Sequence, residues 1–231
     1  MAADFTDALA AVLSRELAEF RSLRCCKQLT AGASQETYRL TVDTASGEML
    51  LALRRSQPTS ATDSSVGGIS LAAEARLFQL AGANNIPGPA IICLLEPADG
   101  LGAGFIMEWL EGETLGQRIV RAEELAAIRP RLARECGEIL GRIHSLDWRA
   151  AGLDAVLPAV DPATLVDETW EYYRQFNVPV PMIDYTWRWL RANLPTASRM
   201  TLVHGDFRNG NLMVTPDGIN AVLDGVGPYR G

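Results

Sequence analysis

The sequence of 231 residues predicts an α+β fold with two lobes. Several short apolar runs before residue 110 alternate with a period of two, as strands do, and one segment among them has helical spacing. Beyond residue 110 the apolar spacing changes to 3.6, and two short apolar runs return near residue 220. We expect residues 1–110 to form an N-terminal lobe with a helix at its start, an antiparallel sheet and one further helix. Residues 111–231 should form a mainly helical lobe that also carries a hairpin.

Two hairpins are expected in the N-terminal lobe. Residues 28–42 are typical of a strand, a turn of small residues and a second strand. Within that turn, Gly32 and Ser34 would let backbone N–H groups approach a phosphate closely, although an ordinary hairpin turn has the same pattern. A second turn at 44–47 leads into a return strand at 48–55.

The return strand ends in two arginines, and a helix is expected after it. Arg54 and Arg55 point to opposite faces of the sheet, because side chains alternate along a strand, and we expect Arg55 to be solvated. Residues 70–80 have apolar side chains on one side of a helix and carry Glu74. An exposed Glu74 that pairs with nothing is as compatible with this pattern as a paired one.

Two strands and three helices are expected next. The run at 90–95 predicts a buried strand, and residues 105–115 predict the next strand and its exit. A helical stripe follows over 122–146, with a possible kink at Pro130.

The last two expected helices are marked by their ends. Asp161-Pro162 is an N-cap followed by Pro at the first helical position, and Pro195 ends a helix over 182–193. The aromatic residues of this region are expected to be core and helix-packing residues, and a substrate-contacting cluster is the alternative: Trp170, Tyr172, Tyr173, Tyr185, Trp187 and Trp189.

A short hairpin near the end of the chain brings polar groups together. Apolar runs flank Asp217-Gly218, which is a strong hairpin signal. With these two residues as the loop, Asn211 lies opposite Asp224, so an amide oxygen and a carboxylate stand side by side. Both are hard oxygen ligands of the kind that Mg²⁺ prefers. Asp206 precedes the hairpin, close enough to accept a proton from a substrate hydroxyl.

The order His204-Gly205-Asp206, then Asn211, then Asp224 resembles the kinase-like phosphotransferases that include aminoglycoside phosphotransferases and choline kinases. The sequence is most similar to the branch whose domain is sometimes fused to acyl-CoA dehydrogenases. An ordinary turn and a solvated strand end would explain the tripeptide alone, but they do not explain the matched Asn and Asp. The resemblance implies a protein-kinase-like, two-lobed fold.

The resemblance also implies roles for particular residues. Asp206 would be the catalytic base, and Asn211 and Asp224 would hold the magnesium ions that bridge the phosphates of ATP. His204 is expected to shape the loop through hydrogen bonds rather than to move protons.

The nucleotide would be held by the N-terminal lobe in this family. Arg54 occupies the position of the cation that contacts the nucleotide phosphates, and Glu74 is the position that would pair with it. The backbone near Glu108 to Leu110 would hydrogen-bond an edge of the adenine.

Composition favours a cytoplasmic enzyme. The net charge of −7 argues against nucleic acid or an anionic membrane as a partner. No run of apolar residues approaches the ~20 that a membrane helix needs, and no secretory signal is evident. The cysteines lack metal-binding spacing and are expected to be free thiols in a reducing compartment: Cys25, Cys26, Cys93 and Cys136.

The last residues depart from the resembled family. Its members continue past the metal-binding Asp with a Trp-Glu-Trp or Trp-Glu-Leu run and further helices, whereas this chain has a different stretch at 225–231. One permitted back-translation of that stretch, read in another frame, encodes Trp-Glu-Trp-Ala-His-Ile-Gly. We therefore expect 225–231 to be frameshifted and the C-terminal helical part to be missing; a natural short variant is the alternative. Helices 122–146 and 182–193 would then leave an apolar side uncovered.

Together these observations predict an ATP-dependent phosphotransferase that phosphorylates a hydroxyl of a small molecule. The alternative is a catalytically inactive, nucleotide-binding remnant of such a kinase. A metal-dependent hydrolase is a poor fit, because the chain has only two histidines.

Overall fold

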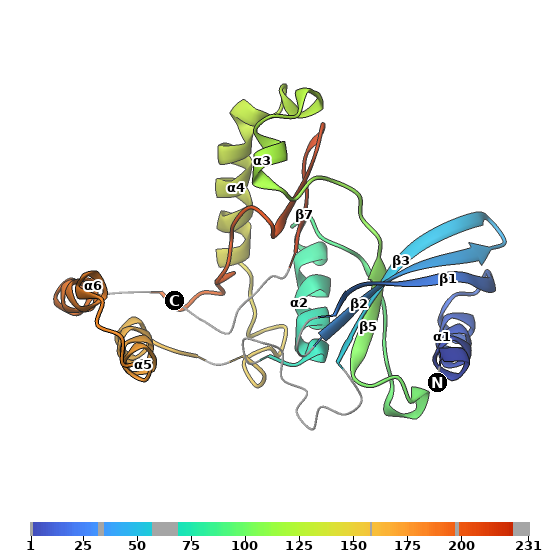
Figure 1. Cartoon of the computed structure of the whole chain (residues 1–231), viewed down its shortest axis with the longest axis horizontal. Coiled ribbons are helices and arrows are strands. Elements are labelled where there is room, and N and C mark those ends of the chain that lie inside the picture. The colour runs from blue at the N-terminus through green and yellow to red at the C-terminus, as the bar shows by residue number, and fades with distance from the viewer. Residues whose placement is uncertain (1, 32–34, 57–68, 158, 197–198, 224–231) are drawn as a thin grey trace.

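The computed structural model describes residues 2–31, 35–56, 69–157, 159–196 and 199–223. Its largest element is a five-stranded antiparallel sheet in the order β1-β2-β3-β5-β4 (Figure 1). The strands are β1 Phe20–Ala31, β2 Gln35–Thr44, β3 Gly47–Ser56, β4 Ile91–Leu94 and β5 Gly104–Glu108. The two hairpins expected from the sequence are the β1–β2 and β2–β3 pairs.

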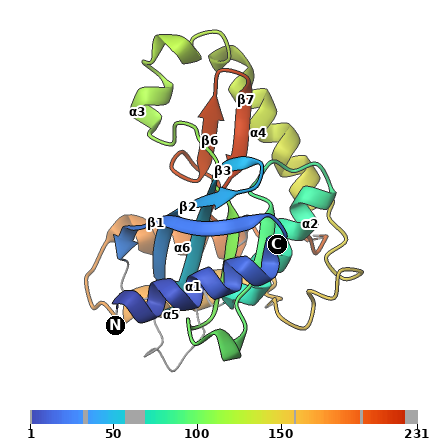
Figure 2. The same ribbon diagram turned by 90° about the vertical axis from the view of Figure 1, so that its right-hand side faces the viewer.

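Helices cover both faces of this sheet. α1, Ala2–Glu16, crosses one face, and α2, Leu71–Ala83, lies against the other (Figures 1 and 2). The side chains of Leu51 and Leu53 are buried toward α1. Ser70 caps α2 by accepting the Ala73 N–H at 3.2 Å, which satisfies one of the donors that a helix leaves unpaired at its start.

The remaining elements follow β5 along the chain, apart from a short 3-10 turn, Pro97–Asp99, between β4 and β5. They are α3 Gly116–Ile119, a 3-10 turn Glu123–Leu125, α4 Arg129–His144, α5 Pro162–Arg174, α6 Pro181–Ala192, β6 Leu212–Thr215 and β7 Gly218–Val222. The β6–β7 hairpin lies beside α4 (Figures 1 and 2). α5 begins as predicted, since Asp161 accepts the N–H groups of Ala163 and Thr164, each at 3.0 Å.

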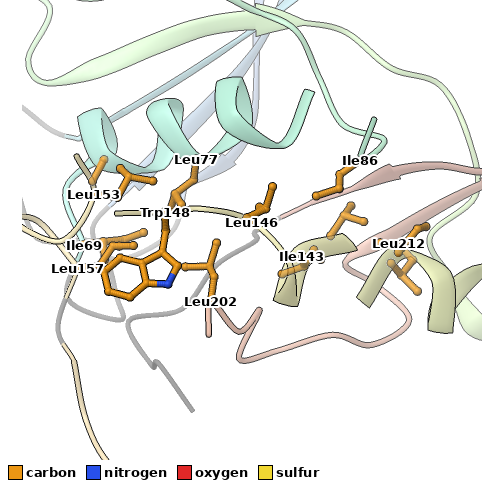
Figure 3. Packing of buried hydrophobic residues seen from close by; sticks show 13 residues of the cluster. Ile69, Leu77, Ile86, Ile143, Leu146, Trp148, Leu153, Leu157, Leu202 and Leu212 are labelled. Carbon is orange, nitrogen blue, oxygen red and sulfur yellow. The ribbon is translucent and has the colours of Figure 1, made fainter. Parts of the chain in front are cut away.

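One buried cluster joins α2 to the second half of the chain (Figure 3). Trp148, which is 3% exposed, packs in it among leucines and isoleucines that come from different elements. Leu77 comes from α2, Ile143 from α4, and Leu212 from β6. The cluster therefore fixes α2, α4 and the start of the hairpin relative to one another.

The helix expected over 122–146 is shorter than predicted. α4 begins at Arg129, and a separate 3-10 turn covers Glu123–Leu125. Pro130 stands in the first turn of α4, where its missing N–H would have had no helical partner. The proline therefore starts the helix instead of bending it.

Some of the aromatic residues of α5 and α6 pack between the two helices, as predicted, but the prediction that they lie in the core is wrong. Trp170 stacks on Trp187 with ring centroids 4.7 Å apart, but Tyr172, Tyr185 and Trp189 are exposed. Of the two helices expected to leave an apolar side uncovered, only α6 does so. The apolar stripe of α4 is largely covered, with Ile139 and Ile143 buried.

The strand expected at 90–95 is less buried than predicted. β4 lies at the edge of the sheet, where it has one neighbour, and only Cys93 of its residues is buried. None of the helices among the described residues combines the length and apolar character needed to cross a membrane.

Candidate active site

The loop between Leu202 and Leu212 carries the candidate catalytic residue. Both leucines are buried in the cluster that joins α2 to α4, so the loop is held at its two ends (Figure 3). Within it, His204 is 2% exposed. The Asp206 N–H donates to His204 Nδ1 at 3.2 Å, and His204 Nε2 lies 3.3 Å from the Leu223 carbonyl oxygen.

These contacts define what His204 does. Because a backbone N–H donates to Nδ1, that nitrogen is an acceptor, and the ring proton belongs on Nε2, facing the carbonyl. Neither ring nitrogen is then left to accept a proton from a substrate. His204 shapes the loop through hydrogen bonds, as the sequence predicted.

Asp206 projects from this loop into solvent. Its side chain is 58% exposed, and the preceding Gly205 has a φ of 81°, in the left-handed region that favours glycine. Buried Asn211 donates from Nδ2 to the Asp206 carbonyl at 3.0 Å and to Asp206 Oδ2 at 2.8 Å. Since the two N–H groups of the amide face Asp206, its oxygen is left as a ligand for a hard cation.

Arg208 is a residue of this loop that sequence reasoning missed. Its Nε lies 2.9 Å and 3.0 Å from the two carboxylate oxygens of Asp206. Both side chains are more than half exposed. The available signal was a permanent cation two positions after the predicted base.

The hairpin that follows turns one residue earlier than predicted. Thr215 pairs with Gly218, so the loop residues are Pro216 and Asp217. The ring of Pro216 sets the φ that the first loop position requires, and the Asp217 N–H donates to Thr215 Oγ1 at 3.3 Å. The Asp-Gly signal found the hairpin but misplaced its loop.

This shift, together with an irregularity in the register between Met213 and Val214, changes the partner of Asn211. The Leu223 N–H donates to the Asn211 carbonyl at 2.7 Å, so Asn211 lies opposite Leu223 and not opposite Asp224. Asp224 lies outside the described residues, and its role as a metal ligand stays a prediction.

Arg54 and Glu74 meet at the interface of β3 and α2. Arg54 Nη1 lies 3.2 Å from Glu74 Oε1, and Arg54 Nε donates to Gln35 Oε1 at 3.0 Å. Glu74 is buried, which excludes the alternative of an exposed, unpaired carboxylate. The pairing implied by the family resemblance and the order of the chain is therefore present.

Arg55 is not solvated, contrary to the prediction. Its side chain is 12% exposed, and its Nη2 lies 2.7 Å from Glu36 Oε2. The guanidinium carbon also stands 4.3 Å from the centroid of the Phe5 ring of α1. The reason is that α1 covers this face of the sheet, and no local pattern in β3 shows that.

A cavity of about 570 Å³ opens between the sheet and the hairpin. Its lining comes from β2, β3, the segment before β4, β5 with the segment after it, and the hairpin with the residue that follows it: Thr37, Arg39, Ala52, Pro89, Met107, Glu108, Trp109, Leu110, Glu111, Gly112, Thr114, Met213 and Leu223. Glu108 and Leu110, both predicted nucleotide contacts, are among them. The Leu110 N–H has no hydrogen-bond partner within the described part of the chain, so it can donate to a ligand.

Of the other predicted nucleotide contacts, Arg54 is not among the described residues that line the cavity. Arg54 follows Ala52 by two residues on the same face of β3, roughly 7 Å further along the strand. Gly32 and Ser34 lie outside the described residues. Arg39 and Trp109 were not singled out from the sequence, although the period of β2 would have placed Arg39 on one face with Thr37.

Known proteins resemble this chain in sequence and in structure. Acyl-CoA dehydrogenase family member 10 of Mus musculus is 30% identical over 160 residues, 65% of this chain and 14% of that protein. A Ralstonia eutropha protein described as an aminoglycoside phosphotransferase is 25% identical with a TM-score of 0.74, over 96% of this chain and 66% of that one. A spectinomycin phosphotransferase solved with ADP and spectinomycin is 11% identical with a TM-score of 0.60, over 97% and 70% of the two chains.

The fold is that of a kinase-like phosphotransferase. It combines a five-stranded sheet that carries the Arg54–Glu74 pair with a loop that holds Asp206 and Asn211 and leads into a hairpin. The model of the Phosphotransferase enzyme family matches residues 26–224, and this chain belongs to that family. The relation to the branch linked to acyl-CoA dehydrogenases is confirmed by the mouse relative. The chain spans 14% of the length of that relative.

Proposed function

We propose that this chain transfers the γ-phosphoryl group of ATP to a hydroxyl of a small molecule. The observation that carries the proposal is the exposed Asp206 carboxylate, which accepts a hydrogen bond from buried Asn211. Asn211 in turn pairs with Leu223, a residue of the cavity lining, so the carboxylate belongs to a loop beside the cavity. The base of the nucleotide would occupy the cavity against the Leu110 N–H, and its phosphates would extend toward Arg54.

The chemistry requires one proton to move. Asp206 would accept the proton of the acceptor hydroxyl as its oxygen attacks the γ-phosphorus, and ADP would leave. Mg²⁺, held by Asn211 and Asp224, would neutralise charge on the phosphates. The donor set fits this ion, because the free amide oxygen of Asn211 is a hard ligand.

The proposal is tested by ADP release from Mg·ATP in the presence of candidate acceptors: an aminoglycoside, a choline-like alcohol and a hydroxyacyl thioester. Asp206→Asn should lower turnover by roughly 100- to 10,000-fold, as expected for loss of a general base, with little change in nucleotide affinity. Asp217→Asn is the matched control, since Asp217 is an exposed aspartate in the loop of the hairpin that follows Asp206. Equal activity of the Asp206 and Asp217 variants would contradict the assignment.

A second candidate function is nucleotide binding without transfer. It is favoured by Arg208, which contacts both carboxylate oxygens of Asp206 and so competes with a substrate hydroxyl for them. Such a protein would be stabilised against heating by Mg·ATP and would phosphorylate none of the acceptors. Arg208→Gln separates the two functions, since release of the carboxylate should restore transfer if Arg208 alone blocks it.

A further inference from the structure

Arg39 stands at the wall of the cavity, in a position that the proposed chemistry does not use. It pairs with Ala52 across β2 and β3, and both residues line the cavity. Its guanidinium carbon lies 5.1 Å from the centroid of the Trp109 ring, in the segment that precedes Leu110. Arg39 therefore lines the cavity beside Trp109, close to the Leu110 N–H that has no hydrogen-bond partner within the described residues.

The charge of Arg39 is poorly compensated by the chain. Its Nε is buried and has no hydrogen-bond partner among the described residues, and no carboxylate in that part of the chain forms an ion pair with it. Glu108 is another residue of the cavity lining, and its carboxylate accepts the Ala90 N–H at 3.4 Å. Burial of an uncompensated polar group costs free energy, so this arrangement points to a ligand that the guanidinium contacts.

The strand register distinguishes two kinds of ligand group. Arg39 is opposite Ala52, whereas Thr37 is opposite Arg54, so Arg39 lies two residues further from the predicted phosphate end of the site. That separation is roughly 7 Å along the strand. A flat cation that already lies over the Trp109 ring is suited to the face of a second aromatic ring.

We propose that Arg39 recognises the base of the nucleotide, with its guanidinium packed on the face of a purine between the sheet and the hairpin residues Met213 and Leu223. The inference rests on the proposed nucleotide site. It assigns a specificity-determining contact to a residue that lies outside both the Asp206 loop and the Arg54–Glu74 pair.

The experiment compares adenosine, which has no phosphate, with Mg·ADP, using dissociation constants from calorimetry or competition. Arg39→Met keeps an unbranched, flexible side chain and removes the charge and the planar group. It should raise the dissociation constants of both probes by the same factor, about two- to thirty-fold, which corresponds to the free energy of a cation–π contact. Arg21→Met is the matched control, because Arg21 is an exposed arginine of β1, and it should leave both constants unchanged.

Each other result has a separate meaning. A loss confined to Mg·ADP would overturn the proposal by making Arg39 a phosphate contact, and unchanged binding of both probes would overturn it as well. If Arg39→Met does not fold, Arg39→Lys provides the test, because lysine keeps the charge but lacks the planar group. This variant should also bind adenosine more weakly than the unaltered protein. If the unaltered protein binds neither probe, the nucleotide site itself is refuted, and the role of Arg39 with it.

Discussion

Burial, more than residue type, decides the chemistry of single side chains in this protein. Cys93 lies in the core between the sheet and α1, and burial raises the pKa of its thiol to about 11. Cys25 is exposed on β1, and all four cysteines are free. Two thiols of the same type thus differ in their access to solvent, so only the exposed one is open to a reagent in the folded chain.

This difference predicts how stability changes with pH. An unfolded cysteine has a pKa of about 8.5, so the unfolded chain loses the Cys93 proton first as the pH rises. The contribution of Cys93 to the free energy of unfolding should be complete below about pH 8.5 and should fall as the pH approaches 11. Denaturant unfolding at pH 8, 9.5 and 10.5 measures the free energy of unfolding. Cys93→Ala should make the fall of this free energy with rising pH less steep.

The exposed Cys25 provides the control for the burial of Cys93. Cys25→Ala removes the exposed thiol and serves as the control for chemical labelling. In the folded protein at pH 8, a thiol reagent should modify Cys25 and should reach Cys93 only on unfolding. Modification of both at equal rates would contradict the burial of Cys93.

Contact between elements depends on a few close approaches. Glu113 and Val214 exchange two backbone hydrogen bonds of 2.8 Å and 2.9 Å, which join the segment after β5 to β6. Gly112 makes this approach possible, since a Cβ atom there would lie 2.4 Å from Met213 Cγ and 3.1 Å from the Val214 carbonyl oxygen. Both Gly112 and Met213 line the cavity, so the contact also sets its width.

Gly112→Ala should therefore destabilise the protein by roughly 1–3 kcal/mol, the usual cost of overpacking. It should also weaken nucleotide binding, because the displaced hairpin changes the cavity. Gly137→Ala is the opposite case: Gly137 lies within α4 with no atom within 4 Å of an added Cβ. That substitution should stabilise the protein by about 1 kcal/mol through helix propensity. Urea unfolding of the two variants measures whether the free energy of unfolding falls for Gly112→Ala and rises for Gly137→Ala. Equal changes in the two variants would refute the steric explanation.

At the scale of the whole molecule, α5 and α6 stand apart from the sheet (Figure 1). They pack on each other through the stacked Trp170 and Trp187 and enclose an apolar groove of about 520 Å³. The groove and its rim expose large apolar side chains, including Met182, which is 70% exposed. Exposed apolar patches of this kind promote association.

Met182→Glu should lower the fluorescence of a bound hydrophobic dye and raise solubility, and it should change the free energy of unfolding by no more than about 0.5 kcal/mol. Gln79→Glu on α2 adds the same charge at an exposed position without removing apolar surface. If both variants improve solubility equally, net charge and not the groove is responsible.

Local signals in the sequence were sufficient for the order and type of most elements. Asp161-Pro162 predicted the start of α5, because capping depends on the side chain beside the first turn. The spacing of His204, Asp206 and Asn211 predicted a loop whose members do contact one another. The pairing of Arg54 with Glu74 was implied by the resemblance to the kinase-like family together with the order of the elements, and the structure contains it.

Only the tertiary structure decided what lies against each face. Alternation along β3 separated Arg54 from Arg55, but α1, distant in sequence, buried Arg55 against Glu36 and Phe5. The aromatic residues of α5 and α6 have helical spacing, which defines a stripe but not whether anything covers it. The cavity, with Arg39 over Trp109, is assembled from segments that lie far apart in the sequence. Hydrophobic period reports the local geometry of one element, whereas burial, charge pairing and cavity shape depend on which elements meet.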